Sequence, residues 1–342
     1  MLSGPRPDSH NLWKGVPDMA VLVTGAAGFI GFHVARALLA QGDIVIGLDD
    51  LNPYYDVRLK ERRRDLLAES SRFSFERADI ADRDAIVQVF GRHPEIDRVV
   101  HLAAQAGVRH SLVDPYVYVR SNLMGQVVLI EAARAGGRVR HIVYASSSSV
   151  YGASTRLPFS TEDRADRPVS LYGATKRADE LIACSYAQMF GVPLTGIRFF
   201  TVYGPWGRPD MSAWLFTKAI LAGEPITLFN KGDMKRDFTF IDDAVKGVLA
   251  ALDRPPSGEG PPHRLYNLGN HRSEPLRRFV SVIEQACGRE AQIRLAPMQA
   301  GDVKETFADI DDSRRDLGFS PTTRIDEGIP RFVAWYREYH GV

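Results

Sequence analysis

The stretch from Ala20 to Gly42 constrains the possible folds more than any other part of the chain. A short apolar run, AVLV, enters the sequence TGAAGFIG, and a helical pattern then continues to Gly42. The glycines at positions 25, 28 and 31 allow a sharp turn, a close approach of the backbone to a pyrophosphate, and tight packing of the helix on the strand. The helix N-terminus then faces the phosphates. Although the spacing is GxxGxxG rather than GxGxxG, this strand, turn and helix predict a dinucleotide site.

The next predicted strand, residues 44–48, ends in Asp49. A carboxylate at this position accepts hydrogen bonds from the adenosine ribose hydroxyls and repels a 2′-phosphate, so it favours NAD over NADP. The alternative is that Asp49 or Asp50 caps the following turn. Arg58 and Lys60 lie too far along the chain to form a clear phosphate clamp.

Strands and helices keep alternating through the first half of the chain. Such alternation predicts βαβ units and therefore an α/β fold with a Rossmann-like, doubly wound parallel sheet. Ligands bind beyond the carboxyl ends of the strands in these sheets, where residues 79–80, 103–105 and 145–149 fall. The other predicted strands are 73–77, 98–102, 141–144 and 194–198, and the other predicted helices are 57–68, 82–90 and 115–135.

The second half of the chain lacks this regular alternation and is predicted to form a smaller mixed α/β C-terminal lobe that closes over a ligand. We therefore divide the sequence into a flexible N-terminal extension (1–18), a cofactor-binding domain (19–200) and a substrate-binding lobe (201–342), with a diffuse boundary that the chain crosses near 199–206. Predicted helices here are 213–222, 242–252, 275–287, 313–317 and 325–339, and predicted extended pieces are 226–229, 237–240, 265–267 and 292–295.

Charge, histidine and cysteine content exclude several classes of function. Lys and Arg number 43 against 42 Asp and Glu, which gives no electrostatic case for a nucleic-acid partner or an acidic membrane. The nine histidines form no ligand-spaced cluster, and no metal is expected. Cys184 and Cys287 lie too far apart in sequence for a disulfide framework and are interpreted as two buried thiols in a reducing cytosol. Residues 1–18 match neither a signal peptide nor a membrane anchor, so a cytoplasmic protein is expected.

The sequence YGATK contains a candidate catalytic pair. On a helix, Tyr172 and Lys176 stand one turn apart on the same face, and an ammonium beside a phenol favours the phenolate. The phenol would then accept a proton near neutral pH. A lone Tyr-x-x-x-Lys is more often a surface pair, but the serine run that follows a buried strand places hydroxyls where Tyr172 should point.

Six motifs in order give the chain a resemblance that extends from residue 20 to residue 339. They are TGAAGFIG, the DI pair at 79–80, HLAAQ, SSSSVYG, YGATK and RFFTVYGP, and together they resemble the extended short-chain dehydrogenase/reductases. Within that family the chain resembles the UDP-glucuronate 4-epimerases, which make UDP-galacturonate. The family also implies a homodimer formed through helices near 115–135 and 171–190. The narrower resemblance rests on LNPYYDVRLK, AAQAGVRHSLVDP, ASSSSVYGAST, FFTVYGPWGRPDM, MKRDFTFIDD and PMQAGDV.

The resemblance implies an NAD-dependent inversion at C4 of UDP-glucuronate through a transient 4-keto sugar, with NAD regenerated in each cycle and kept bound. In it, Tyr172 takes the proton from the C4 hydroxyl, Lys176 tunes Tyr172 and bonds the nicotinamide ribose, and Ser147 bonds the substrate O4. The cofactor contacts expected from the glycine turn, the strand ends and the resemblance are Gly25, Ala27, Gly28, Phe29, Ile30, Gly31, Asp49, Asn52, Asp79, Ile80, Leu102, Ala103, Ala104, Gln105, Asn122, Tyr172, Lys176 and Phe199.

Substrate choice is expected to depend on the sugar carboxylate, which needs a cation or several hydrogen-bond donors. The resemblance places Arg208 at that carboxylate, and a fork-shaped guanidinium suits it. Ser148, Ser149 and Thr201 are short donors at family positions around the same group. Thr201 stands where many neutral-sugar relatives have asparagine, which favours an acidic sugar.

The nucleotide needs its own polar contacts. The resemblance implies that Arg236 meets the phosphates, that Asp302 meets the uridine ribose and that Lys218 assists. Arg109 either joins them or braces the 105–111 loop. The alternative for each of these single charges is a solvated surface residue.

Other functions of the same fold remain open. A sugar-nucleotide 4,6-dehydratase needs acid/base groups beside the first serine or threonine, and SSSSVYG offers none. UDP-glucuronate decarboxylases usually carry a glutamate in that run, which here reads as serines. A UDP-glucose/galactose 4-epimerase has no use for Arg208 and Thr201 as placed. A non-catalytic NAD-binding scaffold is the alternative of a different class, and its signature would be a mutated Tyr, Lys or Ser in the catalytic set.

Overall fold

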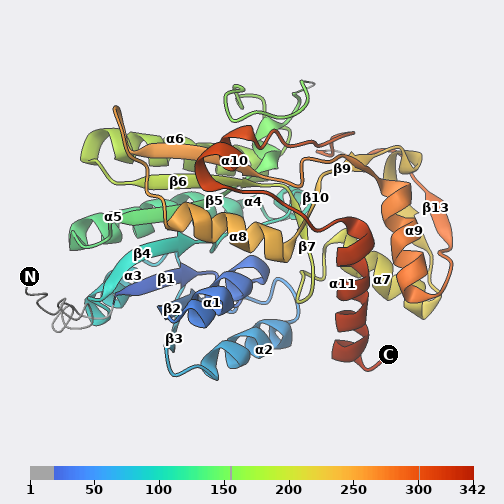
Figure 1. Cartoon of the computed structure of the whole chain (residues 1–342), viewed down its shortest axis with the longest axis horizontal. Coiled ribbons are helices and arrows are strands. Elements are labelled where there is room, and N and C mark those ends of the chain that lie inside the picture. Colours follow the sequence, from blue (N-terminus) through green and yellow to red (C-terminus); the bar gives the residue numbers. More distant parts are fainter. Residues whose placement is uncertain (1–18, 155, 300) are drawn as a thin grey trace, which may run out of the picture.

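A seven-stranded parallel sheet forms the centre of the molecule (Figure 1). The computed structural model describes residues 19–154, 156–299 and 301–342, so the predicted extension 1–18 lies outside the described residues. The strand order is β11-β6-β5-β4-β1-β2-β3, which confirms the predicted Rossmann-like α/β fold. The strands are β1 (Ala20–Thr24), β2 (Ile44–Asp49), β3 (Phe73–Arg77), β4 (Ile96–His101), β5 (His141–Ser147), β6 (Leu194–Phe199) and β11 (His263–Leu268).

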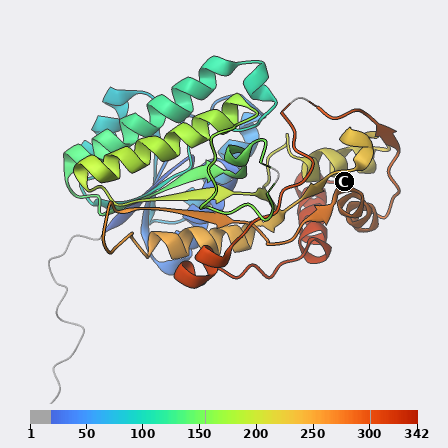
Figure 2. The same ribbon diagram turned by 90° about the horizontal axis from the view of Figure 1, so that it is seen from above.

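Helices cover both faces of this sheet, as the two perpendicular ribbon views show (Figure 2). A strand buried on both faces is apolar along its whole length rather than at alternate positions, which explains a fully buried run such as Ala20–Thr24. One face carries α3 (Arg83–Arg92), α5 (Gly125–Gly136) and α6 (Leu171–Phe190), and the other carries α1 (Phe29–Gln41), α2 (Val57–Ala68) and α8 (Ile241–Leu252).

The single helix predicted over 115–135 is interrupted. The structure has α4 (Pro115–Tyr118), a π-helical segment (Val119–Met124) and then α5. The wide π-helical turn carries Asn122, which is buried and donates from Nδ2 to the Thr175 hydroxyl at 2.9 Å. Local widening of this kind leaves the apolar spacing almost unchanged, so the sequence pattern did not reveal it.

The second lobe is built around three helices and three small two-stranded sheets (Figure 1). Two of these sheets are parallel and the third is antiparallel. The helices are α7 (Ser212–Ala222), α9 (Leu276–Cys287) and α11 (Ile325–His340), and the strand pairs are β7 (Thr201–Tyr203) with β10 (Phe238–Phe240), β8 (Ile226–Leu228) with β13 (Ile293–Leu295), and β9 (Lys235–Arg236) with β12 (Glu274–Pro275).

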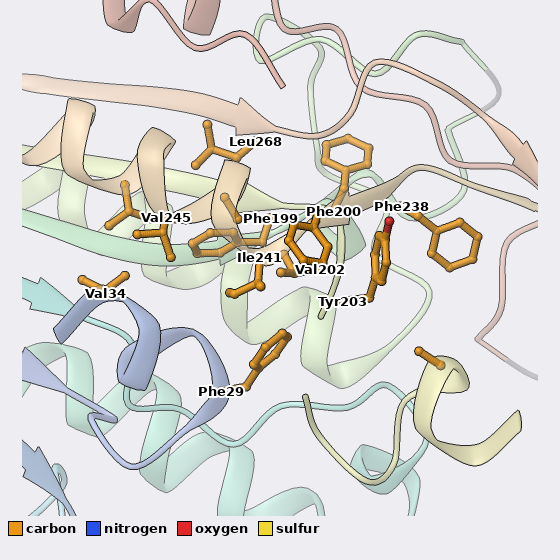
Figure 3. Close-up of a cluster of buried hydrophobic side chains, with 14 of the residues drawn as sticks. Phe29, Val34, Phe199, Phe200, Val202, Tyr203, Phe238, Ile241, Val245 and Leu268 are labelled. Atoms are coloured by element: carbon orange, nitrogen blue, oxygen red, sulfur yellow. The ribbon is translucent and has the colours of Figure 1, made fainter. Parts of the chain in front are cut away.

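Part of the second half of the chain belongs to the large sheet. Strand β11 pairs in parallel with β6 along its whole length, α8 packs on α1, and α10 (Asp311–Leu317) packs on β11. Figure 3 shows the shared core, in which Val34 of α1, Val245 of α8, Phe199 of β6 and Leu268 of β11 converge. The sequence-based boundary near residue 200 therefore does not follow the sheet, because a long-range strand pair leaves no local signal.

Two further features concern the cysteines and the membrane. Cys287 is buried as expected, but Cys184 is exposed on the outer side of α6, so the prediction of two buried thiols was wrong for Cys184. Within the described ranges, no helix is both long enough and apolar enough to cross a membrane.

Candidate active site

A cavity of about 910 Å³ opens at the carboxyl ends of the central strands, between the large sheet and the second lobe. All residues predicted for catalysis and for substrate binding line it, and so do all predicted cofactor contacts except Ala27 and Asn122. Asn122 lies behind the wall, where its Oδ1 accepts a hydrogen bond from the Gln105 backbone N–H at 2.8 Å. Asn122 therefore supports Gln105, which lines the cavity, but does not line the cavity itself.

The glycine turn has no room for side chains. A Cβ added at Gly31 would lie 2.0 Å from the carbonyl oxygen of Gly25, so α1 can pack on the turn only because Gly31 lacks one. Ala27 is fully buried beneath the turn, which is why it does not line the cavity. A bare backbone that opens on a cavity at a helix N-terminus fits a dinucleotide pyrophosphate.

Asp49 caps the turn, as one interpretation of the sequence expected, and its contact with the adenosine ribose stays a prediction. Its carboxylate lines the cavity and also fixes the turn, because it accepts from the N–H groups of Ala27 at 3.1 Å and Leu51 at 2.9 Å. Burial raises its pKa, against the opposing charge of Lys60. Lys60 is itself buried, lines the cavity and donates to the Asn52 side chain at 3.1 Å. The sequence analysis set Lys60 aside because of its distance along the chain, which hid the return of α2 toward the turn.

Tyr172 is held beside the serine run by the start of α6. Ser170 caps this helix by accepting from the Gly173 N–H at 3.0 Å. A Cβ at Gly173 would lie 2.5 Å from the Ser149 carbonyl oxygen, so the first turn of α6 rests directly on the serine turn. Ser147 is buried and ends β5 at the same place. This close approach of two backbones brings the first turn of α6 to the serine turn, and the proximity of the Tyr172 and Ser147 hydroxyls stays a prediction.

Lys176 has a buried partner that the sequence analysis did not identify. Its Nζ lies 3.0 Å from Asp179 Oδ2, and the two side chains are 4% and 1% exposed. Burial raises the pKa of Asp179 to about 6, although the Lys176 ammonium opposes the shift. The neighbouring Glu180 is held separately by Arg198, at 2.7 and 2.8 Å. The i, i+3 spacing of Lys176 and Asp179 was the available signal.

Arg208 reaches the cavity with a carboxylate already beside it. Its Nε donates to Asp210 Oδ1 at 3.0 Å, and the Tyr54 hydroxyl donates to Asp210 Oδ2 at 3.1 Å. Burial and the Asp210 charge raise the pKa of Tyr54 to about 12, so this hydroxyl stays a donor. Thr201, at the start of β7, lines the same cavity. Tyr54 and Asp210 were not predicted, although both belong to the words that carried the resemblance.

Three of the remaining predicted charges, Arg109, Arg236 and Asp302, lie together at the cavity. Arg109 pairs with Asp302 at 3.6 Å and stacks over the Phe229 ring at 4.8 Å. Burial lowers the pKa of Arg236; the Asp302 charge opposes this shift, and the Arg109 charge reinforces it. Lys218 of α7 lines the same cavity. Arg109 therefore lies beside Asp302, and its two predicted roles, a nucleotide contact or a brace for the 105–111 loop, both stay predictions.

Comparison with known proteins gives consistent results. Residues 21–269 match the NAD dependent epimerase/dehydratase family. A UDP-glucuronate 4-epimerase of Arabidopsis thaliana is 48% identical over 94% of this chain and 76% of its own length. A Rhizobium meliloti protein named as a probable UDP-glucuronate 4-epimerase is 46% identical over 93% and 97%. The crystal structure of UDP-glucuronic acid 4-epimerase from Bacillus cereus, in complex with UDP-glucuronic acid and NAD, superposes with a TM-score of 0.87 at 34% identity, covering 94% of this chain and all of the other.

Proposed function

The chain belongs to the NAD dependent epimerase/dehydratase family, and we propose that it inverts C4 of UDP-glucuronate to give UDP-galacturonate with NAD as its bound cofactor. The family predicted from the sequence motifs is confirmed. One observation supports the reaction most directly. The cavity lined by the glycine turn is also lined by Tyr172, Ser147 and Arg208, so one sugar bound there could meet both a proton acceptor and a partner for its carboxylate.

The reaction divides between the cofactor and three side chains. NAD, when bound, supplies a place for the C4 hydride to go and to return from. Tyr172 removes the proton from the C4 hydroxyl and later returns it, while Ser147 holds the same oxygen. Lys176 supplies the positive charge that favours the phenolate. Because the transient 4-keto sugar turns over in the cavity before the hydride returns, the stereochemistry at C4 is inverted.

The C6 carboxylate needs control during this cycle. Once C4 is a ketone, the carboxylate is β to it, and β-keto acids lose carbon dioxide readily. We assign Arg208, Thr201 and Ser149 to hold the carboxylate so that its bond to C5 stays out of line with the ketone π system. Asp210 and Tyr54 support this role by fixing the Arg208 guanidinium from one side.

The competing activities of this fold make different demands on the site. A decarboxylase would have to release the carboxylate as carbon dioxide, which a guanidinium bound to it opposes, and a neutral sugar would offer Arg208 no carboxylate besides that of its existing partner Asp210. The nucleotide contacts proposed for Arg236, Asp302, Lys218 and Arg109 do not distinguish these alternatives, because all of them use a UDP-sugar.

We also propose a homodimer formed through the helices around α4 and α6. Large apolar side chains are exposed on both, among them Tyr116 at 83% and Met189 at 60%. Exposed apolar residues that gather on one face are typical of protein interfaces, and a second copy of the chain would cover both helices symmetrically. The exposed set is Leu112, Val113, Tyr116, Val119, Met124, Leu181, Met189 and Phe190.

A product analysis tests the proposed reaction. Purified protein is incubated with UDP-glucuronate without added reductant, and the nucleotide sugars are resolved. UDP-galacturonate is the expected product, with a Tyr172→Phe variant as the inactive control. UDP-xylose would identify a decarboxylase instead, and the absence of any reaction would favour the scaffold alternative.

A further inference from the structure

Arg63 is a buried cation that the proposed chemistry leaves without a role. Its side chain lies in α2 with no exposed surface, and across the described residues no carboxylate forms an ion pair with it. Burying a guanidinium without a counter-charge costs free energy unless its N–H groups are bonded. The acceptors that surround Arg63 must therefore explain its position.

Two separate parts of the active site share the Arg63 guanidinium. Its Nη1 donates to the carbonyl oxygen of Ala27, in the glycine turn, at 2.9 Å. Its Nη2 donates to the carbonyl oxygens of Trp206 at 2.6 Å and Gly207 at 3.2 Å. A planar fork can serve both sides at once, whereas a compact ammonium cannot. Arg63 thus joins the cofactor turn to the loop that leads directly into Arg208.

That loop does not keep its shape by local preference. Trp206 has a φ of 60°, in the left-handed region that bulky residues avoid. Its ring packs against Trp335 at 5.3 Å and Tyr339 at 5.4 Å. The hydrogen bond from Arg63 fixes the Trp206 peptide in this conformation. Arg208 follows two residues later, so the place of its guanidinium depends on that peptide.

We infer that Arg63 is a positioning residue for the sugar carboxylate: it holds the Arg208 loop in register with the cofactor turn. This inference rests on the proposed function. If the Arg208 loop shifts relative to the glycine turn, Arg208 no longer holds the carboxylate in place. The C5–C6 bond can then align with the π system of the C4 ketone. The C5–C6 bond then breaks, carbon dioxide leaves, and the bonding electrons form an enolate that takes up a proton at C5. C4 is still a ketone at this point, and the return to C4 of the hydride first taken from it completes a UDP-pentose, the product that marks a displaced loop.

The test compares Arg63→Met and Arg63→Lys with Arg62→Met, a control at an exposed neighbour on the same helix. Each protein receives UDP-glucuronate, the products are resolved, and the affinities for UDP-glucuronate and UDP-glucose are measured by calorimetry. We expect Arg63→Met to lower kcat for epimerisation roughly 10- to 100-fold and to raise the pentose share several-fold. Its affinity should fall more for UDP-glucuronate than for UDP-glucose. Arg62→Met should match the wild type.

Arg63→Lys keeps the buried charge but loses the fork, so it carries the test if Arg63→Met does not fold, and it should raise the pentose share as well. Because Arg63 acts through Arg208, the double variant with Arg208→Ala should release no more pentose than Arg208→Ala alone. An unchanged product ratio in both Arg63 variants, or additive pentose release in the double variant, would overturn the inference. A wild type that makes no UDP-galacturonate would overturn the proposed function instead.

Discussion

The Lys176 ammonium lies 3.0 Å from the Asp179 carboxylate, and both side chains are almost completely buried. A carboxylate with a pKa of about 6 is mostly ionised above neutral pH, so it offsets part of the positive field that Lys176 exerts on Tyr172. Asp179→Asn keeps an oxygen for Lys176 but removes the negative charge. We expect the acid limb of kcat/KM against pH to move to lower pH by roughly half to one unit. Glu131→Gln, at an exposed carboxylate of α5, should leave the limb in place. If the acid limb does not move in Asp179→Asn, the Asp179 charge does not offset the field of Lys176 at Tyr172.

Arg208→Ala should change the product as well as the rate. Without the guanidinium the carboxylate is free to align with the ketone, so UDP-pentose should appear while epimerisation falls roughly 100-fold. Thr201→Ala should give the same product in smaller amount, because it removes one neutral donor. Chromatography of the nucleotide sugars measures both effects. Arg58→Ala, at a side chain 84% exposed, serves as the control. Lost activity with no pentose would argue against a carboxylate-holding role.

Gly31→Ala should weaken cofactor binding. The new Cβ would need the space of the Gly25 carbonyl, which lies 2.0 Å away, so α1 must move off the turn at a cost of about 1–3 kcal/mol. NAD retained per chain after purification and the melting temperature should both fall. Gly91→Ala in α3 is the matched control, because among the described residues outside its own helical turn nothing lies within 4 Å of the added Cβ, and alanine favours a helix. Equal NAD retention in both variants would show that the turn tolerates a side chain.

Acid should destabilise the fold partly through His33. This buried side chain donates from Nε2 to the Pro205 carbonyl at 2.9 Å, and burial lowers its pKa from 6.5 to about 4. Because the folded pKa is depressed, the stabilising contribution is complete above pH 6.5 and is lost as the pH falls toward 4. By pH 5 the loss from this group is about 2 kcal/mol. His33→Gln should lose that much less free energy of unfolding between pH 7.5 and pH 5 in urea titrations. An identical loss in variant and wild type would exclude His33 as the source.

The proposed dimer predicts a response to charge at its interface. Tyr116→Arg places a cation on the exposed apolar face beside α6, where a second copy would bury it unpaired. Light scattering after size-exclusion chromatography should then report a monomer. Leu295→Arg, at an apolar side chain of β13 that is 55% exposed, should leave the dimer intact. A monomeric wild type would rule out the dimer altogether.

Long periodic elements were predictable because burial repeats along them. The predicted strand 73–77 and helix 57–68 have the bounds that the structure gives to β3 and α2. Parallel topology also brings all carboxyl strand ends to one edge, which is why the glycine turn, the serine run and Tyr172 were expected in one site. The π-helical segment at 119–124 and the pairing of β11 with β6 were missed, since neither changes the local apolar pattern.

Polar partners from distant parts of the chain were the least predictable features of the site. Tyr54 and Asp210 are 156 positions apart, yet they share a hydrogen bond beside Arg208. Arg63 lies in a run of three arginines, and only its contacts in the fold distinguish it from the exposed Arg62. A single charged residue has the same appearance in sequence whether water or a buried carbonyl surrounds it.

The place of β11 in the sheet has a consequence for synthesis on the ribosome. Translation completes β6 at Phe199 well before it reaches His263, where β11 begins. Until then β6 is an outer strand with unpaired backbone groups, and α8 is not yet present to cover α1. A nascent chain halted near residue 200 therefore contains the glycine turn and the tyrosine helix on an unfinished sheet. Such a chain is expected to require a chaperone until the last strand arrives.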